Sequence, residues 1–135
     1  MRWPSCATTW VTLAALALSA AGCSRQDSRL EQHKKNFESL GATTATIMEG
    51  WLAGRLSGTY TRAALETTFQ LVEQERSALA RAPQSLQDPR GAQLSQTAER
   101  LSRLVAAMML DVTAADGDSA RRRVSEIPIQ PAEHR

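Results

Sequence analysis

Apolar and small residues recur near the middle of the chain at the three- and four-residue spacing of one helix face. The recurring positions are Leu30, Phe37, Leu40, Thr44, Ile47 and Trp51. Spacing of this kind predicts a helix that buries one stripe of its surface. Residues 28–31, Ser-Arg-Leu-Glu, are typical of a capping box at a helix start. We therefore expect a helix from residue 28 to about residue 56.

A second helix is predicted from residue 61 to residue 82, after a short connection that turns the chain back on itself. Its apolar face consists of Leu65, Phe69, Val72 and Leu79. The glutamates Glu66, Glu73 and Glu75 lie mostly away from that face, and Pro83 ends the helix.

The clearest helical pattern follows a loop that holds two prolines and a glycine. Asp88 and Pro89 are typical of an N-cap followed by proline in the first helical turn. The apolar stripe beyond them consists of Leu94, Ala98, Leu101, Val105, Met108 and Val112. Its alternating steps of four and three residues predict an amphipathic helix to about Ala114, with Met108 and Met109 as core residues.

A short fourth helix, capped by Asp118 or Ser119, is expected to run to Ile127 and to pack Val124 and Ile127 on one end of the bundle. Before it, residues 116–118, Asp-Gly-Asp, are expected to end the third helix.

Together these elements predict an all-α fold, a small antiparallel three-helix bundle with a short fourth helix over residues 28–127. Residues 128–135 are expected to form a flexible tail. Seams this regular also suit an alternative, a helical hairpin that completes its core by forming a homodimer.

Gly50, Gly54 and Gly58 are four residues apart near the end of the first predicted helix. We expect Gly58 to end that helix. Glycine weakens a helix interior, so Gly50 and Gly54 need a reason. Close approach of a neighbouring helix is one reason, and simple weakening of the helix near its end is the alternative.

The N-terminal segment follows a different pattern. Arg2 precedes an uncharged stretch with an apolar core at Trp10–Leu18, and small residues then lead to Cys23. A basic start, an apolar core and small residues are the order of an export signal. Polar residues dilute the uncharged stretch, which makes permanent membrane spanning the weaker interpretation. The sequence Ser-Ala-Ala-Gly-Cys at 19–23 resembles the lipobox of bacterial lipoproteins, with Ala20 where leucine is commonest.

This resemblance covers residues 1–24 and implies that residues 1–22 are a cleaved signal peptide. Cys23 would then be lipidated and become the first residue of the mature protein, with residues 23–27 as a polar tether. Acyl chains such as palmitate on Cys23 would anchor the chain, because two or more chains bind a membrane stably. Ser24 in place of aspartate implies the periplasmic face of the outer membrane of the bacterial cell envelope rather than the inner membrane. The alternatives are cleavage by an ordinary signal peptidase near residues 20–22 and an uncleaved anchor helix.

Composition narrows the possible partners. The net charge of +2 provides no basic surface of the kind that nucleic acids require, so we expect no nucleic-acid partner. The only cysteines, Cys6 and Cys23, lie in the N-terminal segment, so no disulfide can join the later helices. Stability must therefore come from packing.

The sequence carries no recognisable catalytic or metal-binding motif. His33 and His134 have no metal-ligand partner at helical spacing, so each is expected to be solvent-exposed. Asp111, Asp116 and Asp118 lack the ligand spacing of a calcium loop. We therefore predict a non-enzymatic protein with no catalytic, cofactor or metal site.

Arg121, Arg122 and Arg123 form the densest run of charge. A solvated helix face, offset by Asp118 and Glu126, is the simplest interpretation. The alternative is contact with an anionic surface, the phosphates of lipid or lipopolysaccharide.

The sequence therefore predicts a membrane-anchored envelope lipoprotein whose helical bundle is a scaffold for an envelope protein partner. The alternative is a periplasmic carrier or sensor that binds an apolar small ligand between its helices. An enclosed cavity lined by leucine and methionine would favour the carrier, and an exposed apolar surface would favour the scaffold. Attachment to the cell wall through a C-terminal lysine, as in the major murein-linked lipoprotein, is not expected, because the sequence ends in Arg135 and its lysines are Lys34 and Lys35.

Overall fold

The computed structural model describes the backbone of residues 9–82 and 87–128, and the side chains from residue 25 onward. Every element in these ranges is a helix, as the sequence predicts. The elements are α1 (Thr9–Leu52), α2 (Gly58–Ala80), α3 (Pro89–Ala114) and α4 (Gly117–Ser125).

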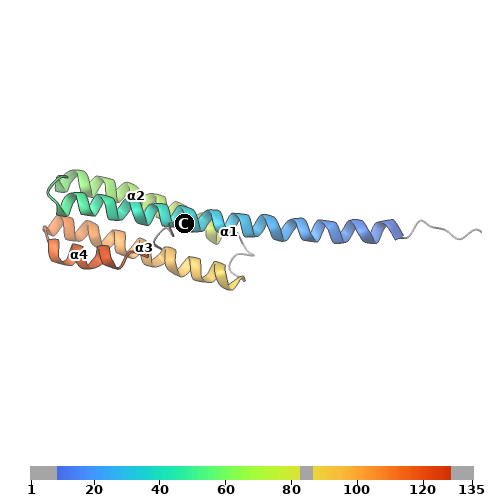
Figure 1. Ribbon diagram of the computed structural model, residues 1–135. Coiled ribbons are helices and arrows are strands. Elements are labelled where there is room, and N and C mark those ends of the chain that lie inside the picture. The colour runs from blue at the N-terminus through green and yellow to red at the C-terminus, as the bar shows by residue number, and fades with distance from the viewer. Residues whose placement is uncertain (1–8, 83–86, 129–135) are drawn as a thin grey trace, which may run out of the picture.

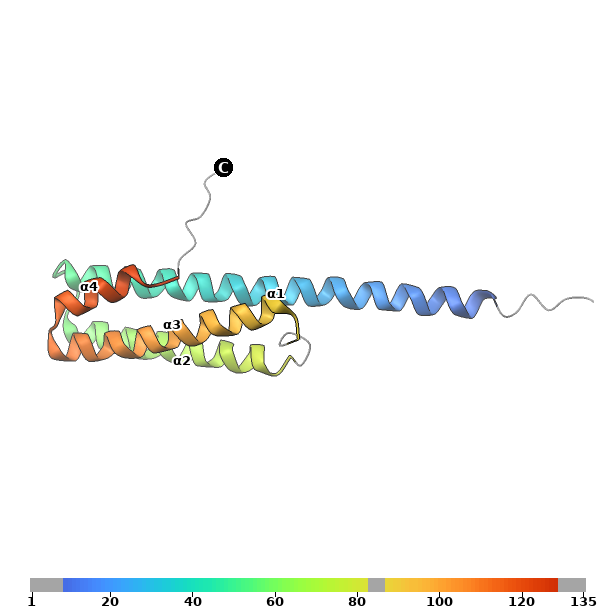
Figure 2. The same ribbon diagram turned by 90° about the horizontal axis from the view of Figure 1, so that it is seen from below.

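The three long helices lie side by side and alternate in direction, which confirms the antiparallel bundle (Figure 1). Helix α2 packs most extensively on α3 and then on α1. Helix α4 contacts both α1 and α3 along part of their length only (Figure 2). We call the end of the bundle at the α1–α2 turn the distal end, and the end where α1 leaves the bundle the proximal end.

The core contains the apolar positions that the helical spacing predicts. The buried residues of α3 include all six of its predicted stripe: Leu94, Ala98, Leu101, Val105, Met108 and Val112. Leu65, Val72 and Leu79 of α2 are buried too. Met48 of α1 is fully buried, although it is not one of the predicted apolar positions. It follows Ile47 in the sequence and lies closer to the centre of the buried face.

Helix α1 begins far upstream of its predicted start. It is continuous from Thr9 to Leu52, so the expectation that Ser28 caps its first turn is wrong. The physical reason is that no proline interrupts these 44 residues, and alanine and leucine favour the helix throughout. The backbone of residues 23–27, predicted as a polar tether, is part of this helix. The side chain of Cys23 lies outside the described residues.

The end of α1 also differs from the prediction, because Gly54 and not Gly58 terminates it. Gly54 has a φ of +71°, a left-handed conformation that glycine adopts without steric cost. The amide of Gly54 donates to the carbonyl of Trp51, and the amide of Arg55 donates to the carbonyl of Gly50, so the last turn is closed. Gly58 is instead the first residue of α2, which is capped by the hydroxyl of Ser57.

The predicted glycine stripe for helix–helix contact is wrong as well. A Cβ on Gly50 would lie 2.7 Å from Cδ1 of Leu56, which belongs to the turn that follows α1 rather than to a neighbouring helix. A Cβ on Gly54 would meet nothing within 4 Å. The absence of a side chain at Gly50 therefore leaves room for the side chain of Leu56.

The later helix boundaries follow the sequence more closely. The carboxylate of Asp88 accepts from the amide of Arg90 and Pro89 opens α3, as predicted. Ala115, at a φ of 53°, ends α3. The cap of α4 is Asp116 rather than Asp118 or Ser119, because its carboxylate accepts from the amide of Ser119. Ile127 is buried and Val124 packs against the core, as expected. Pro128 is the last described residue, so the predicted tail lies almost entirely outside the described part of the chain.

Candidate functional site

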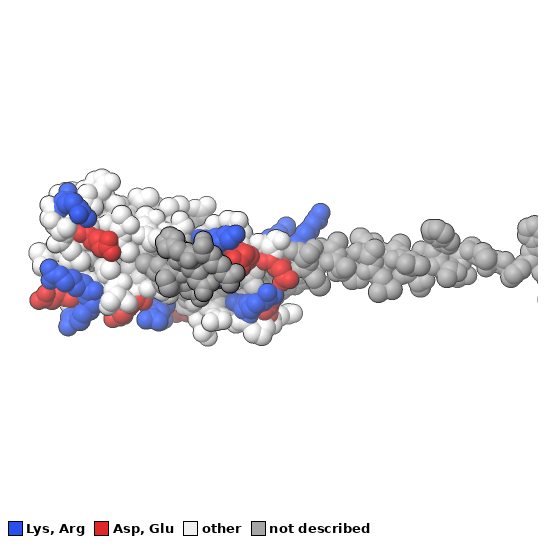
Figure 3. All heavy atoms as spheres, viewed as in Figure 1, with Lys and Arg blue, Asp and Glu red and all other residues white. Residues whose placement is uncertain are grey.

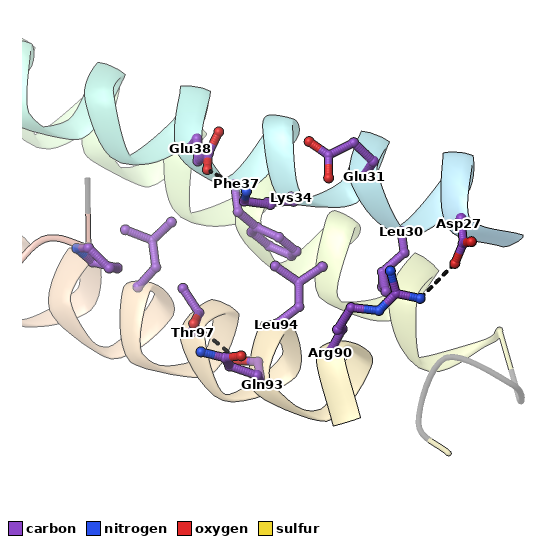
Figure 4. A pocket seen from close by; sticks show the side chains of 12 residues that line it. Asp27, Leu30, Glu31, Lys34, Phe37, Glu38, Arg90, Gln93, Leu94 and Thr97 are labelled. Carbon is purple, nitrogen blue, oxygen red and sulfur yellow. Dashed lines mark hydrogen bonds and ion pairs between the residues drawn. The ribbon is translucent and has the colours of Figure 1, made fainter. Parts of the chain in front are cut away.

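A groove lies between α1 and α3 in the proximal half of the bundle (Figure 4). Its volume is about 420 Å³. The lining residues come from α1, α3 and the segment after α4: Asp27, Leu30, Glu31, Lys34, Phe37, Glu38, Arg90, Gln93, Leu94, Thr97, Leu101 and Pro128. We call this feature the α1–α3 groove.

The floor of the α1–α3 groove is apolar. Leu30 and Phe37 of α1 point toward Leu94 of α3 across the space between the helices (Figure 4). Leu101 of α3 is a further apolar side chain of this floor, and Pro128 also lines the groove. All four floor side chains belong to the hydrophobic core, so the groove is a place where the core comes close to the surface.

The rim of the groove is charged. The guanidinium of Arg90 donates to Asp27 at 2.6 Å and to Asp88 at 2.8 Å, and so links the start of α3 to α1 across the groove mouth. Hydrogen bonds from the side chain and the backbone amide of Arg90 lower the pKa of Asp88. The two carboxylates in turn raise the pKa of Arg90, Asp88 more than Asp27.

Helix α1 supplies the rest of the charged rim. Nζ of Lys34 lies 3.8 Å from Oε1 of Glu38, one turn further along the helix. Glu31 has no ion-pair partner among the described residues. The α1 wall thus presents more negative than positive charge.

The three arginines of α4 have different surroundings. Nε of Arg123 lies 2.7 Å from Oδ2 of Asp111, a carboxylate whose side chain is only 8% exposed. Arg121 pairs with Asp118 at 2.9 Å, and Arg122 donates to the hydroxyl of Ser119. Arg123 therefore ties α4 to α3. Contact with an anionic surface stays a prediction, in which the exposed Arg121 and Arg122 are the available groups.

On the face shown in Figure 3, charged side chains gather over α4 at the distal end and again at the proximal end, where α1 leaves the bundle. The charged residues of the groove rim, Asp27, Glu31, Lys34, Glu38 and Arg90, belong to α1 and α3 near that proximal end.

His33 is not the exposed residue that the sequence predicts. Its Nδ1 lies 2.6 Å from Oε1 of Glu75 on α2, and the side chain of His33 is only 20% exposed. Asn36 donates to the same glutamate oxygen at 2.8 Å. Glu75 thus joins α1 to α2 at the edge of the core. His134 lies outside the described residues.

Glu73 makes a matching link on the other side of α2. It accepts a hydrogen bond of 2.5 Å from the hydroxyl of the buried Ser102 on α3, and another of 2.7 Å from Arg76. The Ser102 hydroxyl, followed by Arg76, lowers the pKa of Glu73. Sequence reasoning placed Glu73 and Glu75 mostly away from the core face and so missed both links. A signal was present, since the two flank the buried Val72 on the edges of that face.

The described residues hold no group of three or more histidine, cysteine or acidic side chains placed to bind a metal ion. Within the same residues, no helix is both long enough and apolar enough to cross a bilayer. The groove itself offers apolar contact along its floor and charged groups on its rim.

Comparisons with protein-family models, curated proteins and solved structures find no match to this chain.

Proposed function

We propose that the protein is a lipid-anchored, non-enzymatic interaction module of the bacterial cell envelope that docks a partner protein in the α1–α3 groove. The observation that carries this proposal is the groove itself, which combines an apolar floor with a charged rim on the outside of the bundle. Protein interfaces have this composition, with an apolar centre and a polar surround.

The lipobox-like sequence supports the anchoring part of the proposal. Asp27, at the groove mouth, follows Cys23 by one helical turn, or about 6 Å along the axis. A lipid on Cys23 would therefore hold the groove beside the membrane surface. The outer membrane, on its periplasmic face, is the location that Ser24 favours.

The rival function, a carrier for an apolar small ligand, has less support. A carrier would be expected to enclose its ligand almost completely. Met48 and Met108, which could line such a cavity, are fully buried in the packed core. The groove lies instead at the surface between two helices, with charged side chains on its rim (Figure 4).

Photo-crosslinking in the cells that make the protein tests this function. A photoreactive side chain at Gln93, on the groove rim, should form an adduct with a second protein. The matched control is Gln96, which is exposed on α3 outside the groove. Adducts at Gln93 that contain only lipid or a small molecule would favour the carrier and contradict the interaction module.

A further inference from the structure

We infer that the occupant of the α1–α3 groove is an amphipathic helix of a partner protein, about three turns long, with basic side chains on its α1-facing edge. This inference rests on the proposed function and adds the chemistry of the partner. It follows from the vacant position in the bundle, the spacing of the groove walls and the charge of the rim.

The groove is the unfilled half of a fourth helix position. Helix α4 lies against both α1 and α3 in the distal half of the bundle and ends at Ser125 (Figure 2). Pro128, three residues later, lines the groove. On the proximal side of Pro128, α1 and α3 continue without α4 beside them. Buried apolar residues of both helices form the groove floor there. A further helix placed there would complete a four-helix arrangement.

The groove walls have the periodicity that a helix recognises. The lining residues of α1 are Asp27, Leu30, Glu31, Lys34, Phe37 and Glu38, and those of α3 are Arg90, Gln93, Leu94, Thr97 and Leu101. Both sets recur every three or four residues and extend over eleven residue steps, or about 16 Å along each helix. Two such neighbouring helices form holes that accept the apolar side chains of a third helix at heptad spacing.

The charged residues of the α1 wall determine which charged side chains the docked helix should carry. On α1, Asp27 and Glu38 each have a positive partner, whereas Glu31 has none among the described residues. Lys34 is the single base on this wall. Basic residues on the α1-facing edge of the occupant would be attracted to Glu31, while acidic residues there would be repelled.

Two other occupants fit less well. The chain's own segment after Pro128 contains Pro131, and a proline disfavours a continuous helix through its position. A second copy packed groove against groove in parallel would bring its α4 against the first α4, so that the exposed Arg121 and Arg122 of each copy would repel those of the other.

Designed peptides test the inference directly. The full chain is placed in phosphatidylcholine nanodiscs, and two helical peptides of about 14 residues are titrated against it by fluorescence anisotropy. Both peptides carry the same leucine stripe, and one has lysine and the other glutamate along one edge. We expect the lysine peptide to bind about tenfold more tightly than the glutamate peptide, after subtraction of binding to empty nanodiscs.

Matched variants place this binding in the groove. Thr97→Phe places a bulky side chain at a half-buried position of the groove lining and should abolish binding, whereas Thr113→Phe, at an exposed α3 threonine with the same hydroxyl-to-carbonyl bond, should leave it unchanged. Glu31→Lys should reverse the preference between the peptides. The control is Glu66→Lys, at an exposed site on α2.

Several results would overturn the inference. These are equal binding of the two peptides, binding that is insensitive to Thr97→Phe, and tenfold tighter peptide binding once residues 129–135 are deleted, which would make the tail the occupant. Self-association of the chain that Thr97→Phe abolishes would make a second copy the occupant.

A crosslinked partner whose contact segment is not helical would leave the interaction module intact and contradict only this inference. Absence of any protein adduct at Gln93 would contradict the module itself.

Discussion

Gly54 is the residue on which the turn between α1 and α2 depends. Its positive φ would strain any residue with a side chain, although there is open space around the position. Gly54→Ala should therefore lower the free energy of unfolding by about 1 kcal/mol. Urea denaturation of the full chain measures this change. Gly117→Ala, at a glycine without positive φ, is the control and should change stability by less than about 0.5 kcal/mol.

Ser102 and Glu73 make stability depend on pH. Because the pKa of Glu73 is lowered in the folded protein, its ionised form contributes stability that is present above the pKa of the unfolded state. This contribution is lost as the pH falls through the lower pKa of the folded state.

Ser102→Ala removes the main cause of that lowered pKa. We expect the variant to lose about 1 kcal/mol at neutral pH, and less at an acidic pH below the pKa of Glu73 in the folded protein, where the glutamate is protonated. Urea denaturation of both proteins at the two pH values measures the difference. An equal loss at both pH values would show that Ser102 acts through packing alone.

At the scale of single elements, the attachment of α4 depends on the Asp111–Arg123 pair. Arg123→Ala leaves the buried Asp111 carboxylate without its cation, which should destabilise the protein by about 2 kcal/mol. Arg122→Ala removes an equal charge from an exposed site and should change stability by less than about 0.5 kcal/mol. Chemical denaturation distinguishes the two, and equal effects would contradict the structural role of Arg123.

The elements differ in how well the sequence predicts them. Helix α3 was predicted almost completely, because Asp88 and Pro89 mark its start and one apolar stripe continues to its end. The start of α1 could not be found from Ser28, since a local capping signal has no effect when helix-forming residues continue on its N-terminal side. The spacing of Gly54 and Gly58 does not show which of them adopts a positive φ and ends α1, nor that Leu56 packs on Gly50 in the turn that follows.

The groove was only partly predictable for a similar reason. Its floor residues Leu30, Phe37, Leu94 and Leu101 were recognised as apolar seam positions. That these buried residues line a groove depends on where α4 ends relative to α1 and α3, which is a property of the packed bundle. The His33–Glu75 contact joins residues that are 42 positions apart, so no local pattern indicates it.

At the scale of the whole molecule, the two cysteines make anchoring testable. Cys23→Ala should move the protein from the membrane fraction to the soluble fraction, because the proposed acyl chains could no longer be attached. Cys6→Ala, within the proposed signal peptide, should leave the protein in the membrane fraction. Fractionation followed by immunoblotting measures both. Membrane retention of Cys23→Ala would contradict the lipid anchor.

The unbroken course of α1 has a mechanical consequence. The helix that carries Cys23 also forms one wall of the groove, with Asp27 and Glu38 as its limits. If Cys23 is fixed in a membrane, the groove residues of α1 lie about 6 to 22 Å from the anchor along the helix axis, because α1 is continuous between them. Tension on a bound partner would pass along this helix to the lipid without stretching any loop, and tilting of the helix would swing the partner with it.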